Sequence, residues 1–194
     1  GLAASLPQAD ETALAAALAR QNSLSKPPGS LGRLEELACF MAAWHGTARP
    51  EINRAQAIVF AGNHGICAQG VNPFPQEVTA QMVLNFQVGG AAINQICRIN
   101  GADLSVIALD LNTPTADFTT GPAMTDAETL DALNKGAAAV DPAADVLVLG
   151  EMGIGNSTVA AALAMALFGG SAADWVGPGT GSDAAGIARK VRAI

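Results

Sequence analysis

Short apolar runs alternate with longer helical patterns over most of the chain. The apolar runs are residues 57–61, 104–109 and 146–149. The helical patterns between and beside them are residues 76–87, 89–99 and 126–140. Each run is too short for a helix and too apolar for a strand with one face in water, so the alternation predicts a parallel sheet with helices on both faces. The expected fold class is α/β, with a doubly wound, Rossmann-like sheet.

The first fifty residues carry helical patterns only. One helix follows Asp10 and runs to about residue 22, and a second is expected over residues 31–45 with Ser30 as its N-cap. The segment between them holds two prolines and two glycines in six residues, which is typical of a rigid connector. The predicted organisation is a helical segment at 1–50, part of a smaller helical subdomain, followed by a parallel α/β nucleotide-binding domain at 51–194.

The last part of the chain predicts further short elements. Residues 159–168 suit a helix buried on most sides, residues 173–177 suit one more short strand, and another helix is expected from Asp183. The loop at 112–125 is the longest without a clear pattern. A helical pattern is still running at residues 191–194, so we expect an incomplete sheet and a longer parent polypeptide.

Composition favours a small-molecule ligand. Half of the 194 residues are hydrophobic, 14% are charged and the net charge is −7. Without runs of lysine or arginine, the chain lacks the basic surface that nucleic-acid binding requires. No basic leader followed by an apolar run opens the sequence, and no stretch reaches about eighteen apolar residues. We therefore expect a cytoplasmic protein that binds neither nucleic acid nor a membrane.

Cysteine and histidine usage does not suggest a metal site. Cys39, Cys67 and Cys97 are odd in number and widely spaced, which suits neither a disulfide framework nor a cysteine metal site. His45 and His64 are the only histidines, too few for a histidine cluster. We expect reduced thiols, no metal and no cofactor.

A glycine turn follows the third apolar run. Residues 150–158 read Gly-Glu-Met-Gly-Ile-Gly-Asn-Ser-Thr and open an alanine-rich helix. The first N–H groups of a helix lack intrahelical partners and carry the positive end of its dipole, so an anion can be stabilised there without a lysine. Glu151 stands at the carboxyl end of the strand, where open sheets place their ligands. Asn156, Ser157 or Thr158 would either cap the helix or bond a phosphate.

A second glycine turn, Gly177-Pro-Gly-Thr-Gly, opens the next predicted helix. Neither turn is a Walker loop, because Gly-Lys-Ser/Thr is absent, and only Gly153 and Gly155 fit the dinucleotide fingerprint. Two such turns in one sheet favour a phosphorylated sugar as the ligand over a purely structural role.

The first strand ends in Gly62-Asn63-His64-Gly65, and a proline-bearing loop follows. Glycines allow a ligand to approach the backbone closely, so this segment suits the lip of a substrate site. His64 is either a turn histidine that bonds local carbonyls or a catalytic group. Phe74, between two prolines, is either a plug under the loop or one wall of a pocket for a flat aromatic ligand.

Six segments in this order resemble one family along nearly the whole chain, the nicotinate-nucleotide:dimethylbenzimidazole phosphoribosyltransferases of cobalamin biosynthesis. The segments are Lys26-Pro-Pro-Gly-Ser-Leu-Gly-Arg-Leu-Glu, Phe60-Ala-Gly-Asn-His-Gly, Pro75-Gln-Glu-Val-Thr-Ala-Gln-Met-Val, Gly89-Gly-Ala-Ala-Ile-Asn, residues 150–158 and Gly177-x-Gly-Thr-Gly. Six ordered segments are far more specific than any one of them.

The resemblance implies transfer of ribose 5-phosphate from nicotinate mononucleotide to 5,6-dimethylbenzimidazole, giving α-ribazole 5'-phosphate and nicotinate. A carboxylate would remove the benzimidazole proton, and positioning would supply much of the remaining advantage. Phosphate and ribose are then expected at Gly153, Gly155, Asn156, Ser157, Thr158, Gly177, Gly179, Thr180 and Gly181. The benzimidazole pocket is expected at Asn63, His64, Phe74 and Gln81. Glu151 would be a supporting carboxylate, and the family implies a homodimer.

Three departures from the family pattern bear on activity. The glutamate assigned as general base lies in the C-terminal part of the family's chains, beyond Ile194. Asn63 stands where many members have aspartate, and Pro178 replaces an arginine, whose loss would weaken a phosphate contact by about 1.5–3 kcal/mol. A non-catalytic phosphate-binding or nucleotide-binding fragment therefore stays as an alternative, as does another sugar-phosphate enzyme such as a nucleoside phosphorylase.

Overall fold

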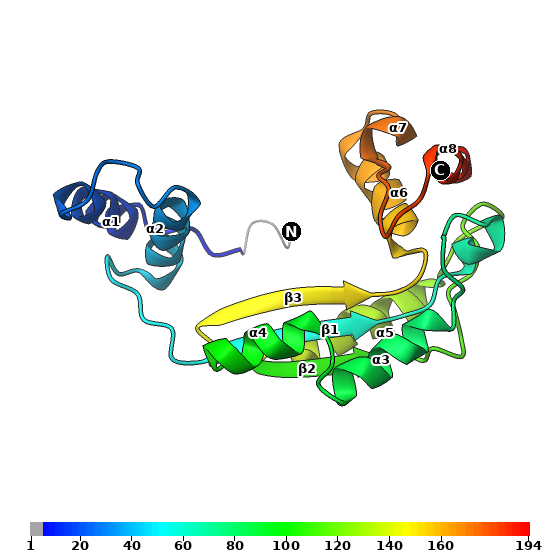
Figure 1. The fold of residues 1–194 in the computed structure, drawn as a ribbon, viewed down its shortest axis with the longest axis horizontal. Coiled ribbons are helices and arrows are strands. Elements are labelled where there is room, and N and C mark those ends of the chain that lie inside the picture. Colours follow the sequence, from blue (N-terminus) through cyan, green and yellow to red (C-terminus); the bar gives the residue numbers. More distant parts are fainter. Residues whose placement is uncertain (1–5) are drawn as a thin grey trace. The chain divides into compact units, whose positions relative to one another are not determined.

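The computed structural model describes residues 6–194, and the chain divides into two compact units (Figure 1). The first unit is Gly1–Asn53 and the second is Arg54–Ile194. The first is helical, and the second contains every strand described in residues 6–194.

The first unit is a pair of helices, α1 (Glu11–Ser23) and α2 (Arg33–His45). Asp10 caps α1, because its Oδ1 accepts a hydrogen bond from Ala13 N at 2.9 Å. Asp10 N also donates to Ala43 O on α2 at 2.9 Å. The core between the helices consists of Ala17, Cys39 and Ala42, with Leu14 packed against them.

The start of α2 differs from the prediction. Its N-cap is Gly32 rather than Ser30, so the expected capping role of Ser30 is wrong. Glu35 explains the difference, since its Oε1 accepts hydrogen bonds from Leu31 N at 3.1 Å and from Lys26 Nζ at 2.6 Å. A carboxylate inside the helix thus binds the preceding turn and keeps that turn outside the helix.

The second unit is built on a parallel sheet with the order β2-β1-β3. The strands are β1 (Ala55–Ala61), β2 (Asp103–Ala108) and β3 (Val146–Met152). Ala57 and Ile58 of the central strand are buried, whereas Val148 and Leu149 of the outer strand β3 are exposed. The predicted α/β class and parallel sheet are confirmed, and the exposed apolar side chains on β3 fit an incomplete sheet.

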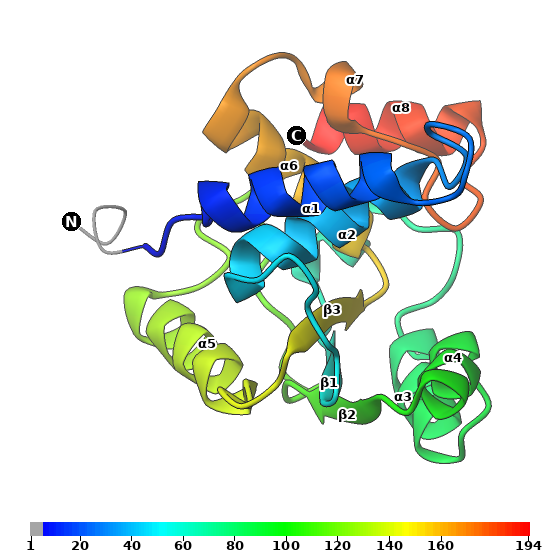
Figure 2. The same cartoon turned by 90° about the vertical axis from the view of Figure 1, so that its left-hand side faces the viewer.

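Helices cover both faces of the sheet (Figure 2). After β1 and the short 3₁₀-helix η2 (Gly65–Gln69), α3 (Val78–Gln87) and α4 (Ala92–Asn100) lie on one face and lead to β2. The other face is covered by α5 (Asp126–Ala139), which leads from β2 to β3. Parallel strands need such crossover connections. The predicted doubly wound arrangement is therefore confirmed.

Three helices follow β3 and lie beyond its carboxyl end (Figure 1). They are α6 (Asn156–Phe168), α7 (Ala172–Trp175) and α8 (Ala184–Ala193). The strand predicted at 173–177 is wrong, because α7 occupies most of that segment. Its helical conformation follows from Asp174, whose Oδ2 accepts hydrogen bonds from Ser171 N at 2.7 Å and Ser171 Oγ at 2.8 Å.

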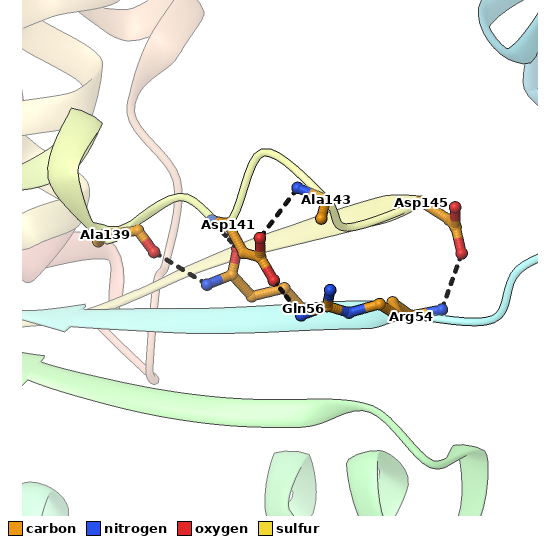
Figure 3. A network of polar contacts seen from close by, with 6 residues as sticks. All are labelled: Arg54, Gln56, Ala139, Asp141, Ala143 and Asp145. Atoms are coloured by element: carbon orange, nitrogen blue, oxygen red, sulfur yellow. Dashed lines mark hydrogen bonds and ion pairs between the residues drawn. The ribbon is translucent and has the colours of Figure 1, made fainter.

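A polar network at the amino end of the sheet ties β1 to the loop before β3 (Figure 3). Gln56 Nε2 donates to Ala139 O, and Gln56 Oε1 accepts from Asp141 N, both at 2.9 Å. Arg54 forms an ion pair with Asp141 at 2.5 Å, and its backbone N donates to Asp145 Oδ2 at 2.8 Å. These bonds fix where β3 begins beside β1, and hence which residues face each other at the opposite end of the sheet.

The described residues contain neither a helix that could span a membrane nor a cluster that could hold a metal ion. None of the helices in 6–194 combines the length and the apolarity that a bilayer-spanning helix needs. Within the same range, no three His, Cys, Asp or Glu side chains are grouped so as to hold a metal ion. Cys39, Cys67 and Cys97 are free thiols, as predicted.

Candidate functional site

The carboxyl ends of β1 and β3 lie side by side, and so do the turn that follows β1 and the glycine turn that follows β3. The register pairs Phe60 with Glu151, the residue that precedes the last position of β3. Just beyond the paired residues, Gly62 N donates a hydrogen bond to Met152 O at 3.0 Å. The Gly-Asn-His-Gly turn after β1 is therefore joined directly to the glycine turn after β3, at the edge where parallel sheets place ligands.

Close packing between these turns explains two of the glycines. A Cβ on Gly153 would lie 2.3 Å from Gly62 O and 2.9 Å from His64 Nε2. A Cβ on Gly155, whose φ is 90°, would lie 2.9 Å from Cys67 Sγ. Both positions therefore exclude a side chain because of the neighbouring turn. The family resemblance implies that these glycines hold the phosphate and ribose, and the structure adds this packing requirement.

Glu151 is exposed and points its carboxylate toward the start of α6. Its Oε2 accepts a hydrogen bond from Asn156 Nδ2, and Asn156 Oδ1 accepts one from Ser157 N at 2.7 Å. Gly155 is the N-cap of α6, without a side-chain hydrogen bond. Of the two alternatives for Asn156, Ser157 and Thr158, capping is therefore wrong, since these residues form the first turn of the helix, and phosphate binding stays a prediction.

Most backbone N–H groups of this turn already have partners. Asn156 N donates to Gly153 O at 3.0 Å and Thr158 N donates to Gly155 O at 3.1 Å. Ser157 N is bonded to Asn156 Oδ1. An anion held by free N–H groups alone, as the sequence predicted, is consequently poorly supported here, and the positive charge has to come from elsewhere.

Lys190 supplies that charge. It lies in the last turn of α8, is only 3% exposed, and takes part in no ion pair among residues 6–194. Its Nζ donates to Ser157 Oγ and to Gly177 O, both at 3.2 Å. A Cβ on Gly179 would lie 3.1 Å from the same Nζ. The two glycine turns, separate in sequence, thus meet around one buried ammonium group.

Burial lowers the pKa of Lys190 because it disfavours the charged form. An anion placed beside the ammonium would offset this penalty, whereas the hydroxyl and the carbonyl that now contact it carry no net charge. A buried lysine with neutral partners is therefore suited to binding a negatively charged ligand.

Sequence reasoning missed Lys190, although a signal was present. In the helix that was expected from Asp183, Gly186, Ile187, Lys190 and Val191 fall on one face at helical spacing. The other three side chains on this face are apolar or absent, and Gly186 is buried in the structure as well. A lysine within an apolar helix face is therefore the sequence pattern by which Lys190 could have been recognised.

His64 lies in the same region, and its imidazole contacts the glycine turn through Gly153. Burial lowers the pKa of His64, and the negative charge of Glu151 partly offsets this effect. The backbone of His64 is also engaged, because its carbonyl accepts a hydrogen bond from Gln76 Nε2 at 3.1 Å and Thr115 pairs with it in an isolated bridge. The imidazole is thus expected to be neutral at pH 7, able to donate or accept one hydrogen bond.

Asn63 has a structural contact. Its Nδ2 donates to Leu111 O at 2.8 Å and so ties the turn after β1 to the loop after β2. That loop, predicted to lack regular structure over residues 112–125, contains no helix or strand. The amide nitrogen of Asn63 is therefore already used within the protein, whereas its Oδ1 is buried without a hydrogen-bond partner among residues 6–194.

Glu151 is a lining residue of two cavities. One has a volume of about 680 Å³, and its lining includes His64, Glu151, Met152, Asn156, Ser157 and Trp175. The other, of about 420 Å³, is almost wholly apolar, and its lining includes Met82, Phe86, Ile93, Val148, Leu149 and Glu151. The structure thus brings Glu151, His64, Asn156 and Ser157 together. Phe74 and Gln81 are not among the lining residues of either cavity.

The arrangement offers three chemical capacities. Lys190 and Ser157 can hold an anion, the apolar cavity can hold a flat ring, and the carboxylate of Glu151 between the two cavities can accept a proton. These are the requirements of a transfer reaction between a sugar phosphate and an aromatic base.

Known proteins support the same interpretation. The sequence matches the model of the phosphoribosyltransferase family DBI_PRT over residues 6–194. It is 72% identical over 193 residues to the nicotinate-nucleotide–dimethylbenzimidazole phosphoribosyltransferase of Rhodobacter capsulatus, covering 100% of this chain and 58% of the relative. The enzyme of the same name from Roseobacter denitrificans is 63% identical over 189 residues, or 97% of this chain and 56% of that protein.

Solved structures agree with these sequence relatives. The crystal structure of CobT from Thermus thermophilus aligns with a TM-score of 0.79 and 40% identity, over 94% of this chain and 60% of that one. A second structure from this organism, named as the same phosphoribosyltransferase, aligns with a TM-score of 0.81 and 39% identity, over 95% and 60%. The chain spans a little more than half the length of the relatives it matches. It belongs to the nicotinate-nucleotide–dimethylbenzimidazole phosphoribosyltransferase family.

Proposed function

We propose that this chain forms the N-terminal part of an enzyme that moves ribose 5-phosphate from nicotinate mononucleotide to 5,6-dimethylbenzimidazole. The products are α-ribazole 5'-phosphate and nicotinate, a step of cobalamin lower-ligand assembly. The names of the relatives support this activity. The observation that carries it is the ammonium of Lys190 between the two glycine turns.

The phosphate of the mononucleotide binds at that junction. Lys190 and Ser157 supply a charge and a hydroxyl, and the second turn at residues 177–181 closes the site from the other side. The remaining predicted positions, Thr158 and Thr180 among them, lie within these two turns. The ribose then extends from Ser157 toward Glu151, because both residues border the same cavity.

The benzimidazole lies in the apolar cavity that ends at Glu151. Its ring is flat and mostly apolar, which suits a lining of Met82, Phe86 and strand side chains. Phe74, which is 46% exposed, and Gln81, on the outer side of α3, remain predictions for the rim of this pocket.

The reaction needs one bond exchange and one proton transfer. A benzimidazole nitrogen attacks the ribose C1′, and the C1′–N bond to the pyridinium breaks with its electron pair remaining on nicotinate. The other benzimidazole nitrogen loses its proton to a carboxylate. Glu151, which borders the same cavity as Ser157, supports that proton transfer.

A non-catalytic phosphate-binding or nucleotide-binding fragment is the alternative, and the names of the relatives do not support it. Incubating this chain with both substrates and measuring nicotinate separates the two. Release that depends on both substrates supports the transferase, binding of the mononucleotide without release supports the fragment, and absence of both contradicts each. Release driven by inorganic phosphate instead of benzimidazole would indicate a phosphorylase.

The assembly as a homodimer and the cytoplasmic location, inferred from the family pattern and the sequence, are also proposals. Sedimentation of the purified chain over a range of concentrations tests the dimer, and cell fractionation tests the location. A monomer at all concentrations would contradict the first, and recovery in the membrane fraction would contradict the second.

A further inference from the structure

The peptide groups of Ile154 are held by two side chains from another part of the fold. Ile154 N donates to Thr79 Oγ1 at 3.1 Å. Ile154 O accepts a hydrogen bond from Cys67 Sγ at 3.1 Å. Thr79 lies in the first turn of α3 and Cys67 lies in η2, so both partners follow β1 in sequence. The contacts thus join the segment that follows β1 to the glycine turn that follows β3.

The contact of Ile154 with Thr79 is buried, and its contact with Cys67 is partly buried. Thr79 is 0% exposed and Ile154 is 7% exposed. A buried N–H group without a partner costs free energy, so Thr79 cannot release Ile154 N without a penalty. The thiol of Cys67 is also partly buried, which raises its pKa and keeps it protonated as a donor.

Ile154 lies between Gly153 and Gly155, the two residues with the greatest backbone freedom in the turn. Gly155 has a φ of 90°, a conformation that only glycine adopts readily. A segment with glycine on both sides of one residue does not hold a single conformation by local preference alone. The fixed orientation of the Ile154 peptide therefore depends on Thr79 and Cys67.

The orientation of this peptide determines where the ligand-facing groups lie. Asn156, which bonds Glu151, and Ser157, which bonds Lys190, follow it within three residues. A rotation of the Ile154 peptide would change the direction in which α6 starts and would move both groups. Tight packing of Gly155 against Cys67 transmits any such shift to the turn after β1.

We propose that Thr79 and Cys67 are positioning residues for the phosphate and ribose site, which they organise through the Ile154 peptide before a ligand binds. This inference rests on the proposed function for the identity of the ligand. Neither residue touches the reacting atoms; each acts by holding the turn between Glu151 and Ser157 in one conformation.

Three variants of the 194-residue chain test the proposal. Thr79→Val keeps the shape and removes the acceptor, whereas Thr79→Ser keeps the acceptor and removes a methyl group. Val83→Ala, a buried position on the same helix, provides a loss of stability without a contact to Ile154. The measurements are the dissociation constant for nicotinate mononucleotide by calorimetry, the unfolding free energy, and amide hydrogen exchange at residues 153–157.

Thr79→Val should weaken mononucleotide binding by about tenfold and speed exchange at Ile154, since one buried hydrogen bond is lost. Thr79→Ser should bind within about twofold of the unmodified chain, and so should Val83→Ala despite its lower stability. Equal binding by Thr79→Val and Val83→Ala would overturn the positioning role while leaving the proposed function intact.

Absence of mononucleotide binding by the unmodified chain would count against the proposed function instead. The exchange data then decide the positioning role. Faster exchange throughout residues 153–157 in Thr79→Val than in Val83→Ala supports it, and equal exchange in the two variants overturns it.

Discussion

The ammonium of Lys190 lies 3.2 Å from the hydroxyl of Ser157, and this contact joins two glycine turns that are separate in sequence. Because Lys190 is buried with neutral partners, its charge is not compensated within the described residues. A site of this kind favours an anionic ligand and reduces the stability of the free protein.

Lys190→Met should change ligand affinity and folding stability in opposite directions. The methionine keeps an apolar stem and removes the ammonium, so mononucleotide binding should weaken by about 10- to 150-fold, the effect of one charge-assisted hydrogen bond. The unfolding free energy of the free chain should rise, because the penalty of burying a charge is removed. Calorimetry and urea unfolding measure the two effects.

The matched control is Arg192→Met, which removes an exposed positive charge from the same helix. It should change neither the affinity for the mononucleotide nor the unfolding free energy appreciably. A similar loss of binding in both variants would mean that only the net charge of α8 matters.

Folding stability should depend on the protonation of His64. Burial lowers its pKa below 6.5, so between the folded and unfolded values the unfolded chain binds more protons. The contribution of neutral His64 to the unfolding free energy is therefore fully present above the pKa of the unfolded state. It is lost as the pH falls from that value through the lower pKa of the folded state. Urea unfolding at about pH 7.5 and about pH 5.5 measures this loss, and His64→Gln should reduce it. An unchanged pH dependence in His64→Gln would disprove the assignment.

The charge of Glu151 should affect the pKa of His64. Since the carboxylate raises the pKa of His64 against the effect of burial, Glu151→Gln should lower that pKa further. An NMR titration of the imidazole measures the change. Glu77→Gln, which removes a carboxylate just before α3, serves as the control and should leave the titration where it is. A rise in the pKa of His64 in Glu151→Gln would contradict the geometry described.

Gly153→Ala should be strongly destabilising. Its Cβ would lie 2.3 Å from Gly62 O, a backbone atom that cannot move without opening the sheet edge, and overpacking of this kind costs about 1–3 kcal/mol. Gly136→Ala is the matched control, because open space surrounds Gly136 within α5. It should stabilise the chain by about 0.5–1 kcal/mol, the helix preference of alanine over glycine. Equal unfolding free energies for the two variants would refute the packing argument.

Much of the fold could be predicted from sequence, because each strand is a short apolar run bounded by polar or glycine residues. The runs at 57–61 and 146–149 lie inside β1 and β3. The errors have local causes. The segment 173–177 has the composition of a strand, yet Ser171 and Asp174 form a capping arrangement that starts a short helix.

The candidate site could be predicted only in part. Glu151 and the turn after it were recognisable because they follow a strand directly. Lys190 was missed because its importance depends on Ser157 and Gly177, which the fold brings to it from 33 and 13 residues away. In the same way, the role of Thr79 toward Ile154 depends on a contact between residues 75 apart, which no local pattern indicates.

We expect the junction of the two glycine turns at Lys190 to bind the phosphate of a pyridine mononucleotide. The most direct measurement compares the affinity of the chain for nicotinate mononucleotide with that for the nucleoside lacking the phosphate. The nucleoside should bind at least about tenfold more weakly, and inorganic phosphate should compete with the mononucleotide. Equal affinity for the two ligands, with no competition by phosphate, would contradict it.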